Sequence, residues 1–388
     1  MLKLNSLNIQ NYRNLKKLTI STLDRVNLIT GKNNTGKSTI LEAIAIYATN
    51  GSIIDELLFE RGEYSDHNEF LQRRRRVENE AENNTIENNI KTLSSLFTDR
   101  LIGFDQSNAI LIGHIENTLF GEKPSIPKSI SLGFKKYTIE LAKSDSGMPT
   151  SRKIVLQDDL QDDYGDSKVG FEIKTGNISY DFLKLDSERF FRSNFRVTNS
   201  NYNIQFIKTK NINKQKNGNL FDKIALTGKE KYIIDALKII EPSTERIAFI
   251  ESDFSDARKP VIKLSNSKYV LPLQSMGDGI NRILTIILAL VNADNGFLLI
   301  DEFENGLHYS VQKKLWKTIF ELAKKLNVQV FATTHSSDCI DSFGAVLNDI
   351  NDASGKLIRL ENNNNGIECI EFNANELKIA SERNIEIR

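Results

Sequence analysis

The sequence predicts an α/β fold in which helices flank a mostly parallel sheet, with antiparallel strands beside it and a helical insertion. Three observations predict this fold. In the last third of the chain, almost wholly apolar strands alternate with helical patterns, which is typical of a parallel sheet covered on both faces. Near the N-terminus, a Gly-rich loop joins an apolar strand to an apolar helix. Between these regions, several stretches alternate apolar and polar residues, as antiparallel strands do.

The composition is that of a globular protein. Its 388 residues, 39% of them hydrophobic and 26% charged, are enough for one large or two medium domains. No apolar run reaches the roughly 18 residues of a membrane-spanning helix, and the N-terminus lacks the apolar stretch of a signal peptide. The lack of a long apolar run also predicts no membrane partner. Cys339 and Cys369 match no metal or disulfide pattern, which favours a reduced, cytoplasmic setting.

The predicted elements fall into two halves of one domain, residues 1–60 and 128–388. Residues 61–127 between them are charged and rich in asparagine, so we predict an exposed helical insertion with little core of its own. The predicted strands cover residues 2–12, 16–21, 25–30, 128–143, 152–157, 168–182, 296–301, 328–336 and a hairpin at 356–372. The predicted helices cover residues 38–48, 229–240, 310–326 and a long apolar stretch that ends near 293.

Two segments are basic although the formal net charge of the chain is zero. Arg73 to Arg76 form one block. Residues 201–245 form a basic segment followed by a helix, and from 201 to 231 seven lysines stand against Asp222 and Glu230. Each segment fits either a nucleic-acid patch or a solvated face, and the sequence leaves both open. Residues 214–219, KQKNGN, are expected to form a loop.

The Gly-rich loop GKNNTGKS fits the pattern G-x-x-x-x-G-K-S/T and lies between a strand and a helix, where a phosphate-binding loop belongs. Its glycines let the backbone curl around phosphate, and the helix adds the positive end of its dipole. Lys37 can reach the β- and γ-phosphates, and Ser38 can bind Mg²⁺. The alternative is a Gly-rich turn without a ligand. The candidate nucleotide-binding residues here are Gly31, Asn33, Asn34, Gly36, Lys37, Ser38 and Thr39.

Three carboxylates follow directly on the apolar strand in LLIDEFENGL. Asp301 stands at the carboxyl end of the strand, where α/β sheets bind ligands, and can hold the Mg²⁺ that bridges the phosphates. Glu302 is then the candidate catalytic base that orients the attacking water. The cation and Lys37 would offset the repulsion between the carboxylates. Glu304 is expected at a turn or a subunit contact, and the alternative for the whole group is a solvated strand end.

Two histidines stand near these carboxylates. His335 follows the next apolar strand in TTHS, where an imidazole can donate to the γ-phosphate and sense its loss. We count it as a catalytic candidate together with Glu302 and Lys37. The alternative is a histidine satisfied at a strand end. His308 lies in ENGLH, and a subunit contact is its favoured role.

A second Gly-rich turn, QSMGDGINR, precedes the long apolar helix and again has the composition of an anion-binding helix start. Because GKNNTGKS already serves the chain's own nucleotide, this turn makes sense if it reaches the nucleotide of another copy across a two-fold interface. The alternative is an ordinary turn that caps a helix. The candidate residues are Ser275, Gly277, Asp278 and Gly279.

Together, GKNNTGKS, SMGDGINR, LLIDEFENGLH and TTHS resemble the motifs of the P-loop ABC-type ATPase heads of the SMC, RecF and OLD families. The closest resemblance is to the compact OLD-like ATPases of bacterial anti-phage systems, which include the ATPase component of PARIS. SMGDG stands where that superfamily has its signature motif. NYRNL resembles the aromatic-Arg element, which implies that Arg13 lies near the nucleotide or DNA. Gln205 is a candidate for the Q-loop glutamine, without a pattern around it.

The chain departs from these families at two points. The OLD proteins carry a C-terminal TOPRIM nuclease domain, whereas only 52 residues follow TTHS here, so we expect no TOPRIM domain. The SMC proteins have long coiled coils between their motif halves. Lys37 and Asp301 are 264 positions apart without a sustained heptad pattern, so we expect no long arm.

The resemblance implies an ATPase with ATP and Mg²⁺ as cofactors. It implies a head-to-head dimer or higher oligomer that switches a separate effector, such as a nuclease, in anti-phage defence. The alternatives are a DNA-repair ATPase of the RecF or SMC kind that binds nucleic acid, and a scaffold that binds ATP without turnover. A transporter subunit is disfavoured because the signature differs and the insertion is large.

Overall fold

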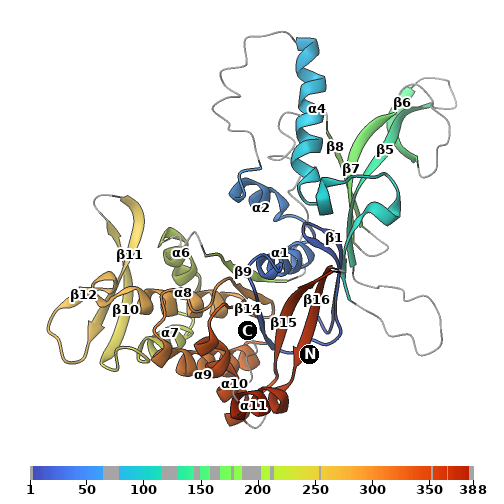
Figure 1. Cartoon of the computed structure of the whole chain (residues 1–388). Coiled ribbons are helices and arrows are strands. Elements are labelled where there is room, and N and C mark those ends of the chain that lie inside the picture. The colour runs from blue at the N-terminus through green and yellow to red at the C-terminus, as the bar shows by residue number, and fades with distance from the viewer. Residues whose placement is uncertain are drawn as a thin grey trace. The chain divides into compact units, whose positions relative to one another are not determined.

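The computed structural model describes most of the chain (Figure 1). The residue contacts divide the chain into two compact units, which we call unit 1, residues 1–5, 20–41 and 201–388, and unit 2, residues 6–19 and 42–200. The described residues are 3–63, 78–114, 129–143, 149–157, 167–175, 179–185, 202–209, 214–252, 255–350, 353–364 and 366–383.

Unit 1 is built on a six-stranded sheet in the order β16-β15-β3-β14-β13-β9. The five strands from β15 to β9 are parallel, and β16 forms an antiparallel hairpin with β15. The strands are β3 Val26–Gly31, β9 Ile204–Ile207, β13 Phe297–Ile300, β14 Gln329–Thr333, β15 Gly355–Asn363 and β16 Gly366–Phe372. The mostly parallel sheet and the C-terminal hairpin are thus as the sequence predicts.

The central strands of this sheet are buried on both faces. Every residue of β3, β13 and β14 is buried. On one face, alternate residues join the core cluster that also contains the apolar sides of the helices; these strand residues are Val26, Leu28, Leu298, Ile300, Val330 and Ala332. A strand that is apolar at every position has this environment, which explains the continuous apolar runs in the sequence.

Helix α8, Asp278–Asn292, and helices α9, Tyr309–Lys325, and α10, Ser337–Asp349, are the long helices of unit 1. Their apolar sides enter the same core cluster. Phe303 stacks on Trp316 of α9, with ring centroids 3.9 Å apart and planes at 15°. Ser336 caps α10, because its hydroxyl accepts the Cys339 N–H. The side chain of His308 caps α9 in the same way by accepting the Ser310 N–H.

The rest of unit 1 includes a three-stranded antiparallel sheet of β10 Thr244–Ser252, β11 Ser255–Leu264 and β12 Val270–Pro272. The smaller helices are α6 Lys214–Ile224, α7 Glu230–Leu237, η3 Leu273–Met276 and α11 Ala374–Glu382. The expected loop at 214–219 is wrong, since α6 begins at Lys214. Asn217 donates to the Thr285 hydroxyl at 2.8 Å, and Leu220 is buried, so packing against α8 overrides the weak helix propensity of KQKNGN.

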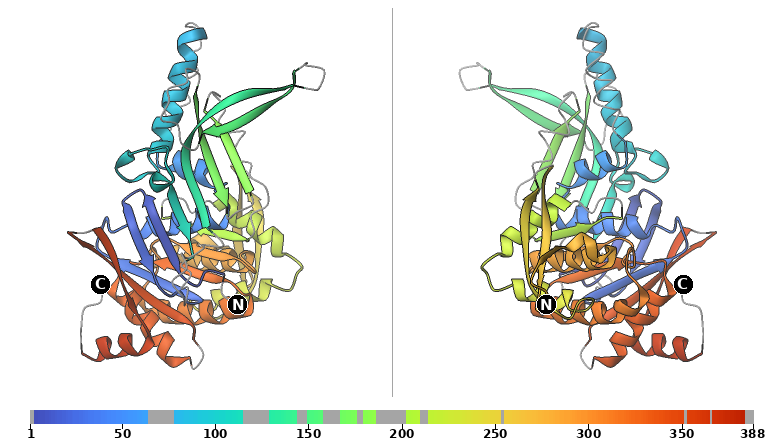
Figure 2. Two further views of the ribbon diagram at one scale, coloured as in Figure 1. Left: turned by 90° about the vertical axis from the view of Figure 1, so that its right-hand side faces the viewer. Right: turned by 90° about the vertical axis from the view of Figure 1, so that its left-hand side faces the viewer.

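Unit 2 contains a seven-stranded antiparallel sheet in the order β2-β1-β4-β5-β7-β8, with β6 paired to β5. Its strands are β1 Leu7–Tyr12, β2 Leu15–Ile20, β4 Ile110–Gly113, β5 Ser129–Lys143, β6 Pro149–Gln157, β7 Lys168–Thr175 and β8 Ser179–Lys184. Figure 2 shows β5 and β6 as a long ribbon that curves away from the rest of this sheet. The antiparallel strands predicted for the middle of the chain are confirmed.

The remaining elements of unit 2 are helical. Helix α1, Lys37–Ala48, starts among the unit 1 residues and ends among those of unit 2. The others are α2 Ile54–Glu60, α4 Glu78–Ser94, η1 Thr98–Arg100 and η2 Gln106–Asn108. Residues 61–127, predicted as a helical insertion, contain α4 but also β4, which pairs with β1 and β5. None of the helices in the described ranges is both long and apolar enough to cross a bilayer.

Candidate functional site

The GKNNTGKS loop connects β3 to α1, as predicted, and its backbone conformation explains its residues. Gly31 has φ 141° and Gly36 has φ 88°, values that side chains rarely permit. A Cβ at Gly31 would lie 2.5 Å from the Leu360 carbonyl oxygen of the neighbouring strand β15. Asn34 also has a positive φ, 64°, and both Asn33 and Asn34 are exposed. The backbone at the two glycines therefore constrains the conformation of the loop, while the asparagines between them are exposed to solvent.

Lys37 begins α1 with its side chain folded back over the loop. Its ammonium donates to the carbonyl oxygens of Gly31 and Lys32, each at 2.7 Å. Burial lowers the pKa of Lys37 to about 8, against the opposite effect of nearby carboxylates, of which Asp301 is the strongest. Thr39, the last residue of the predicted loop set, is buried in the first turn of the helix.

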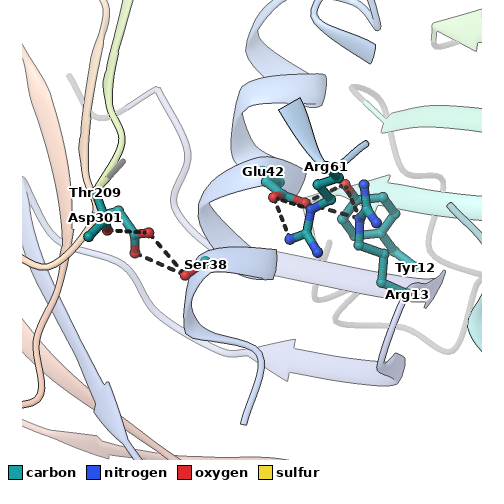
Figure 3. A network of polar contacts seen from close by, with 7 residues as sticks. All are labelled: Tyr12, Arg13, Ser38, Glu42, Arg61, Thr209 and Asp301. Atoms are coloured by element: carbon teal, nitrogen blue, oxygen red, sulfur yellow. Dashed lines mark hydrogen bonds and ion pairs between the residues drawn. The ribbon is translucent and has the colours of Figure 1, made fainter. Parts of the chain in front are cut away.

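Ser38 and Asp301 meet, although they are 263 residues apart in sequence (Figure 3). The Ser38 hydroxyl lies 3.0 Å from Oδ1 and 3.1 Å from Oδ2 of Asp301. Thr333 donates to Oδ1 at 2.7 Å and Thr209 donates to Oδ2 at 3.0 Å. Three hydroxyls from three segments thus converge on one carboxylate.

The sheet order explains this convergence. Strand β14 lies between β3 and β13, and β9 lies beyond β13, with all four parallel. Their carboxyl ends therefore share one edge, where open α/β sheets bind ligands. The phosphate loop follows β3, Asp301 follows β13, Thr209 follows β9, and His335 follows β14. The sequence predicted this arrangement for the phosphate loop, Asp301 and His335 but missed Thr209 and Thr333, because single threonines have no motif of their own.

The donor set at this edge fits a magnesium ion. Mg²⁺ prefers hard oxygen ligands, and it commonly takes one or two carboxylates together with phosphate oxygens and water. Asp301 supplies the carboxylate and Ser38 the hydroxyl, already in contact. Within the part of the chain that the structure describes, at this edge or away from it, no three His, Cys, Asp or Glu side chains group together as a metal site of their own, so the ion would depend on nucleotide and water oxygens for its other ligands. Neither Cys339 nor Cys369 forms a disulfide within the described residues, and burial raises their thiol pKa values to about 12 and about 11.

Glu302 occupies a constrained backbone position next to Asp301. Its φ is 48°, a left-handed value that is uncommon for a glutamate. Its N–H donates to the Thr333 hydroxyl at 2.9 Å. Its carboxylate, by contrast, has no hydrogen-bond partner among the described residues, so the backbone is fixed while the acid group stays available.

Arg282, on α8, holds the backbone of Asp301 and Glu302 by hydrogen bonds. The sequence analysis did not predict this residue as part of the site. Its Nη2 donates to the carbonyl oxygens of Asp301 and Glu302, at 3.0 and 2.8 Å. Arg282 is 1% exposed, and its Nε and Nη1 have no partner in the described part of the chain. Burial lowers the pKa of its guanidinium, while the carboxylate of Asp301 opposes this shift. An arginine within the apolar run GINRILTIIL was the sequence signal that could have revealed it.

Glu304 and the two histidines lie in the turns after β13 and β14. The Glu304 carboxylate accepts the Thr334 hydroxyl at 2.8 Å and the His335 N–H at 2.7 Å. The His335 imidazole is half-buried and has no hydrogen-bond partner within the described ranges. His308 is exposed, and its ring contacts Tyr309 with centroids 4.3 Å apart. Its predicted role in a subunit contact stays a prediction.

The turn SMGDG leads into α8 as predicted. Ser275 is exposed and donates to the Pro272 carbonyl oxygen at 2.7 Å. Gly277 has φ 92° and open space where a Cβ would be, and Asp278 is the first residue of α8. A Cβ at Gly279 would lie 3.3 Å from the Gly306 carbonyl oxygen, so this turn packs closely on the loop after β13.

Arg13 belongs to a network within unit 2, also drawn in Figure 3. Its Nε lies 3.1 Å from the Glu42 carboxylate and 3.3 Å from the Tyr12 hydroxyl. Arg61 pairs with the same glutamate. Burial, with the Glu42 charge, raises the pKa of Tyr12. Arg13 has φ 52°, and its Nη2 is buried without a partner among the described residues. The role implied for Arg13 beside a nucleotide or DNA stays a prediction.

Two further candidates lie elsewhere. Gln205 lies inside β9, opposite Leu298, and the hydroxyl that reaches Asp301 from the segment after β9 belongs to Thr209. The block Arg73 to Arg76 lies outside the described residues, as do parts of the basic segment 201–245. For both basic segments, the choice between a nucleic-acid patch and a solvated face stays open.

Comparison with known families decides the class of this domain. A profile described as "AAA ATPase domain" matches residues 2–181 and 63–340, which together cover most of the chain. The chain belongs to the AAA ATPase domain family. The matched region contains the phosphate loop, SMGDG, Asp301 and His335. An ATPase domain of mixed α/β fold, with antiparallel and parallel sheets flanked by helices, is thus confirmed, whereas the resemblance to OLD-like and PARIS proteins stays a prediction.

Curated relatives of this AAA ATPase domain match over short stretches. An "ATP/GTP phosphatase" of Helicobacter pylori is 36% identical over 89 residues, 22% of this chain and 24% of that protein. Two uncharacterized proteins of Methanocaldococcus jannaschii, MJECL10 and MJECL11, are 38% and 41% identical over 68 and 66 residues. These matches cover 16% and 17% of this chain and 31% and 58% of those proteins. Each match therefore spans less than two thirds of the relative's own length.

Solved structures similar to this one include SMC heads. The Smc head bound to the C-winged helix domain of ScpA has a TM-score of 0.47 and 14% identity, covering 97% of this chain and 99% of that one. The SMC head domain from Thermotoga maritima has a TM-score of 0.41 and 11% identity, covering 96% and 99%.

Proposed function

We propose that this chain binds and hydrolyses ATP with Mg²⁺, and that ATP-bound copies pair to control a separate effector protein. The observation that carries the proposal is the contact of the Ser38 hydroxyl with both carboxylate oxygens of Asp301, at 3.0 and 3.1 Å. It joins the phosphate loop to the acidic strand end, with Lys37 at the same helix start. Nucleotide hydrolysis needs these parts within reach of one triphosphate.

Each side chain has a role that follows from its contacts. Lys37 would exchange its two loop carbonyls for phosphate oxygens, because a charged acceptor binds an ammonium more strongly than a neutral one does. Ser38 and Asp301 would hold Mg²⁺, which neutralises phosphate charge when bound. Glu302, with its backbone fixed and its carboxylate unpaired, would orient the attacking water as a general base. His335 would donate to the terminal phosphate from the end of β14.

The pairing of two copies is supported by the second Gly-rich turn. Ser275 is exposed, Gly277 faces open space, and helix α8 begins directly afterwards. Such a helix start binds anions, and the turn would reach the nucleotide held by a twin molecule. Assembly that depends on ATP would then act as the switch. The effector, a nuclease in anti-phage defence, rests on the resemblance of the motifs to OLD-like ATPases.

Two substitutions test the proposal. Lys37→Ala should lose ATP binding, because it removes the cation that meets the phosphates. Glu302→Gln should retain ATP, abolish turnover and accumulate a dimer, since binding survives when water activation fails. Calorimetry, phosphate release and light-scattering mass would measure these three properties, with the exposed Lys317→Ala as a control. If both variants lost ATP affinity equally, or if wild type released no phosphate, the roles assigned here would be wrong.

Two additional measurements address the partner. Salt-dependent DNA binding by the isolated protein would favour the DNA-repair alternative over the effector switch. Co-expression with the product of the adjacent gene, where that product is a nuclease, would test the effector directly. Nuclease activity that changes between wild type and Glu302→Gln supports the switch, and identical activity with both contradicts it.

A further inference from the structure

The geometry assigns to Glu304 the task of positioning His335, an inference that rests on the proposed ATPase function. The two residues lie 31 positions apart, after neighbouring parallel strands β13 and β14. Glu304 is not itself a catalytic residue in this scheme. It holds the backbone of His335 and so fixes the position from which the imidazole would donate to the terminal phosphate.

The contacts of Glu304 hold the whole turn between β14 and α10. One carboxylate oxygen accepts the His335 N–H at 2.7 Å, and the other accepts the Thr334 hydroxyl at 2.8 Å. The same Thr334 oxygen accepts the Ser336 N–H at 3.0 Å. Three consecutive residues are thus tied, directly or through one hydroxyl, to a single side chain. The bond from the His335 N–H is short for an N–H···O contact, as expected when the acceptor is charged.

A carboxylate suits this position for a second reason. The turn leads into α10, whose N-cap is Ser336, and the first amides of a helix carry the positive end of its dipole. A negative charge is therefore stabilised here, while the His335 imidazole itself has no partner in the described part of the chain. The backbone is held and the ring remains free, which is the arrangement that a positioned donor requires.

The loop that carries Glu304 also packs on the start of α8. A Cβ built on Gly279 would lie 3.3 Å from the Gly306 carbonyl oxygen. A Cβ built on Gly306 would lie 3.9 Å from the Cβ of Asp278. Movement of the SMGDG turn would therefore press on the Glu304 loop and, through the carboxylate, on His335. This contact gives a physical route by which a second copy could affect hydrolysis in the first.

A double-mutant cycle tests the inference. We expect His335→Ala to lower kcat roughly 100-fold, the scale of a lost acid–base group. Glu304→Ala should lower kcat about 10- to 100-fold, the scale of a misplaced group, with ATP affinity within about threefold of wild type. The double variant should be no slower than His335→Ala, within about threefold, because both changes remove one function. Losses that multiply would overturn the inference.

Two variants separate positioning from general damage. Glu304→Gln keeps one oxygen to accept the His335 N–H, and its NH₂ can donate to the Thr334 hydroxyl oxygen in place of the bond now made to the second carboxylate oxygen. This variant should therefore recover kcat to within about threefold of wild type. Glu321→Ala, on the exposed side of α9, should leave kcat unchanged. If Glu304→Gln were as slow as Glu304→Ala, while both melted at the wild-type temperature, geometry would not be what Glu304 supplies.

A spectroscopic readout does not depend on turnover. The chain has four histidines, and the His335 imidazole signal in a ¹³C-histidine NMR spectrum is the one that disappears in His335→Ala. Glu304→Ala should broaden or split this signal, because the ring samples several positions, and should leave the other three sharp. An unchanged His335 signal would overturn the inference even if wild type hydrolysed no ATP. Failure of phosphate release alone would count against the proposed function instead.

Discussion

The lowered pKa of Lys37 predicts that ATP binding weakens at alkaline pH. In the free protein, burial brings the pKa of this ammonium from 10.5 to about 8. Phosphate groups favour the charged form and raise the pKa again on binding, so the protein takes up a proton when it binds ATP above pH 8. Affinity is thus retained below this pH and lost as the pH rises through it. Lys37→Arg, whose guanidinium stays charged throughout, is the matched control.

The size of the effect follows from the charged fraction. With a pKa of about 8, Lys37 is charged in about 76% of molecules at pH 7.5 and about 3% at pH 9.5, and apparent Kd varies inversely with this fraction. The Kd for ATP·Mg²⁺ should therefore rise roughly 25-fold, while the terminal phosphate, with a second pKa of about 6, stays ionised. Isothermal titration calorimetry in two buffers of different ionisation enthalpy measures both Kd and proton uptake. A flat Kd, or an equal slope in Lys37→Arg, would refute the reasoning.

Two other substitutions test the supports of the site. Thr333→Val removes the hydroxyl that donates to Asp301 and accepts the Glu302 N–H, so unfolding free energy should fall by about 1–3 kcal/mol. Its kcat should fall roughly tenfold, while Thr318→Val on α9 should change neither. Gly31→Ala forces a Cβ to 2.5 Å from the Leu360 oxygen and should abolish ATP binding with a loss of at least about 1–3 kcal/mol. Gly344→Ala, inside α10 at an ordinary φ, should cost nothing, and equal melting temperatures for the two alanine variants would contradict this account.

The parts of the site that sequence alone could predict are those with a local pattern. GKNNTGKS combines a strand, two glycines and a helix start, and LLID combines a buried strand with an acid at its end. Both patterns reflect backbone requirements that few residues satisfy. The same holds for the parallel sheet, since a strand covered on both faces must be apolar throughout.

The remaining parts depend on contacts between distant segments. Thr209 and Thr333 reach Asp301 only because β9 and β14 flank β13 in one register. Arg282 donates to the carbonyl oxygens of Asp301 and Glu302 only because the fold places them beside α8. Helix α6 was missed because Leu220 and Asn217 are held by α8, which local propensity does not reveal. Strand β4, within the stretch expected to be helical, likewise forms because β1 and β5 offer open edges.

The stack of Phe303 on Trp316 gives the protein a natural optical reporter. Trp316 is the single tryptophan of the chain, and its partner lies two residues after Asp301. Indole emission responds to changes in such a stack, so any shift of this loop on ligand addition would alter the signal of the unmodified protein. Stopped-flow mixing could then follow loop motion in real time without a dye or labelled nucleotide, and every variant that retains Phe303 and Trp316 could be compared on the same scale.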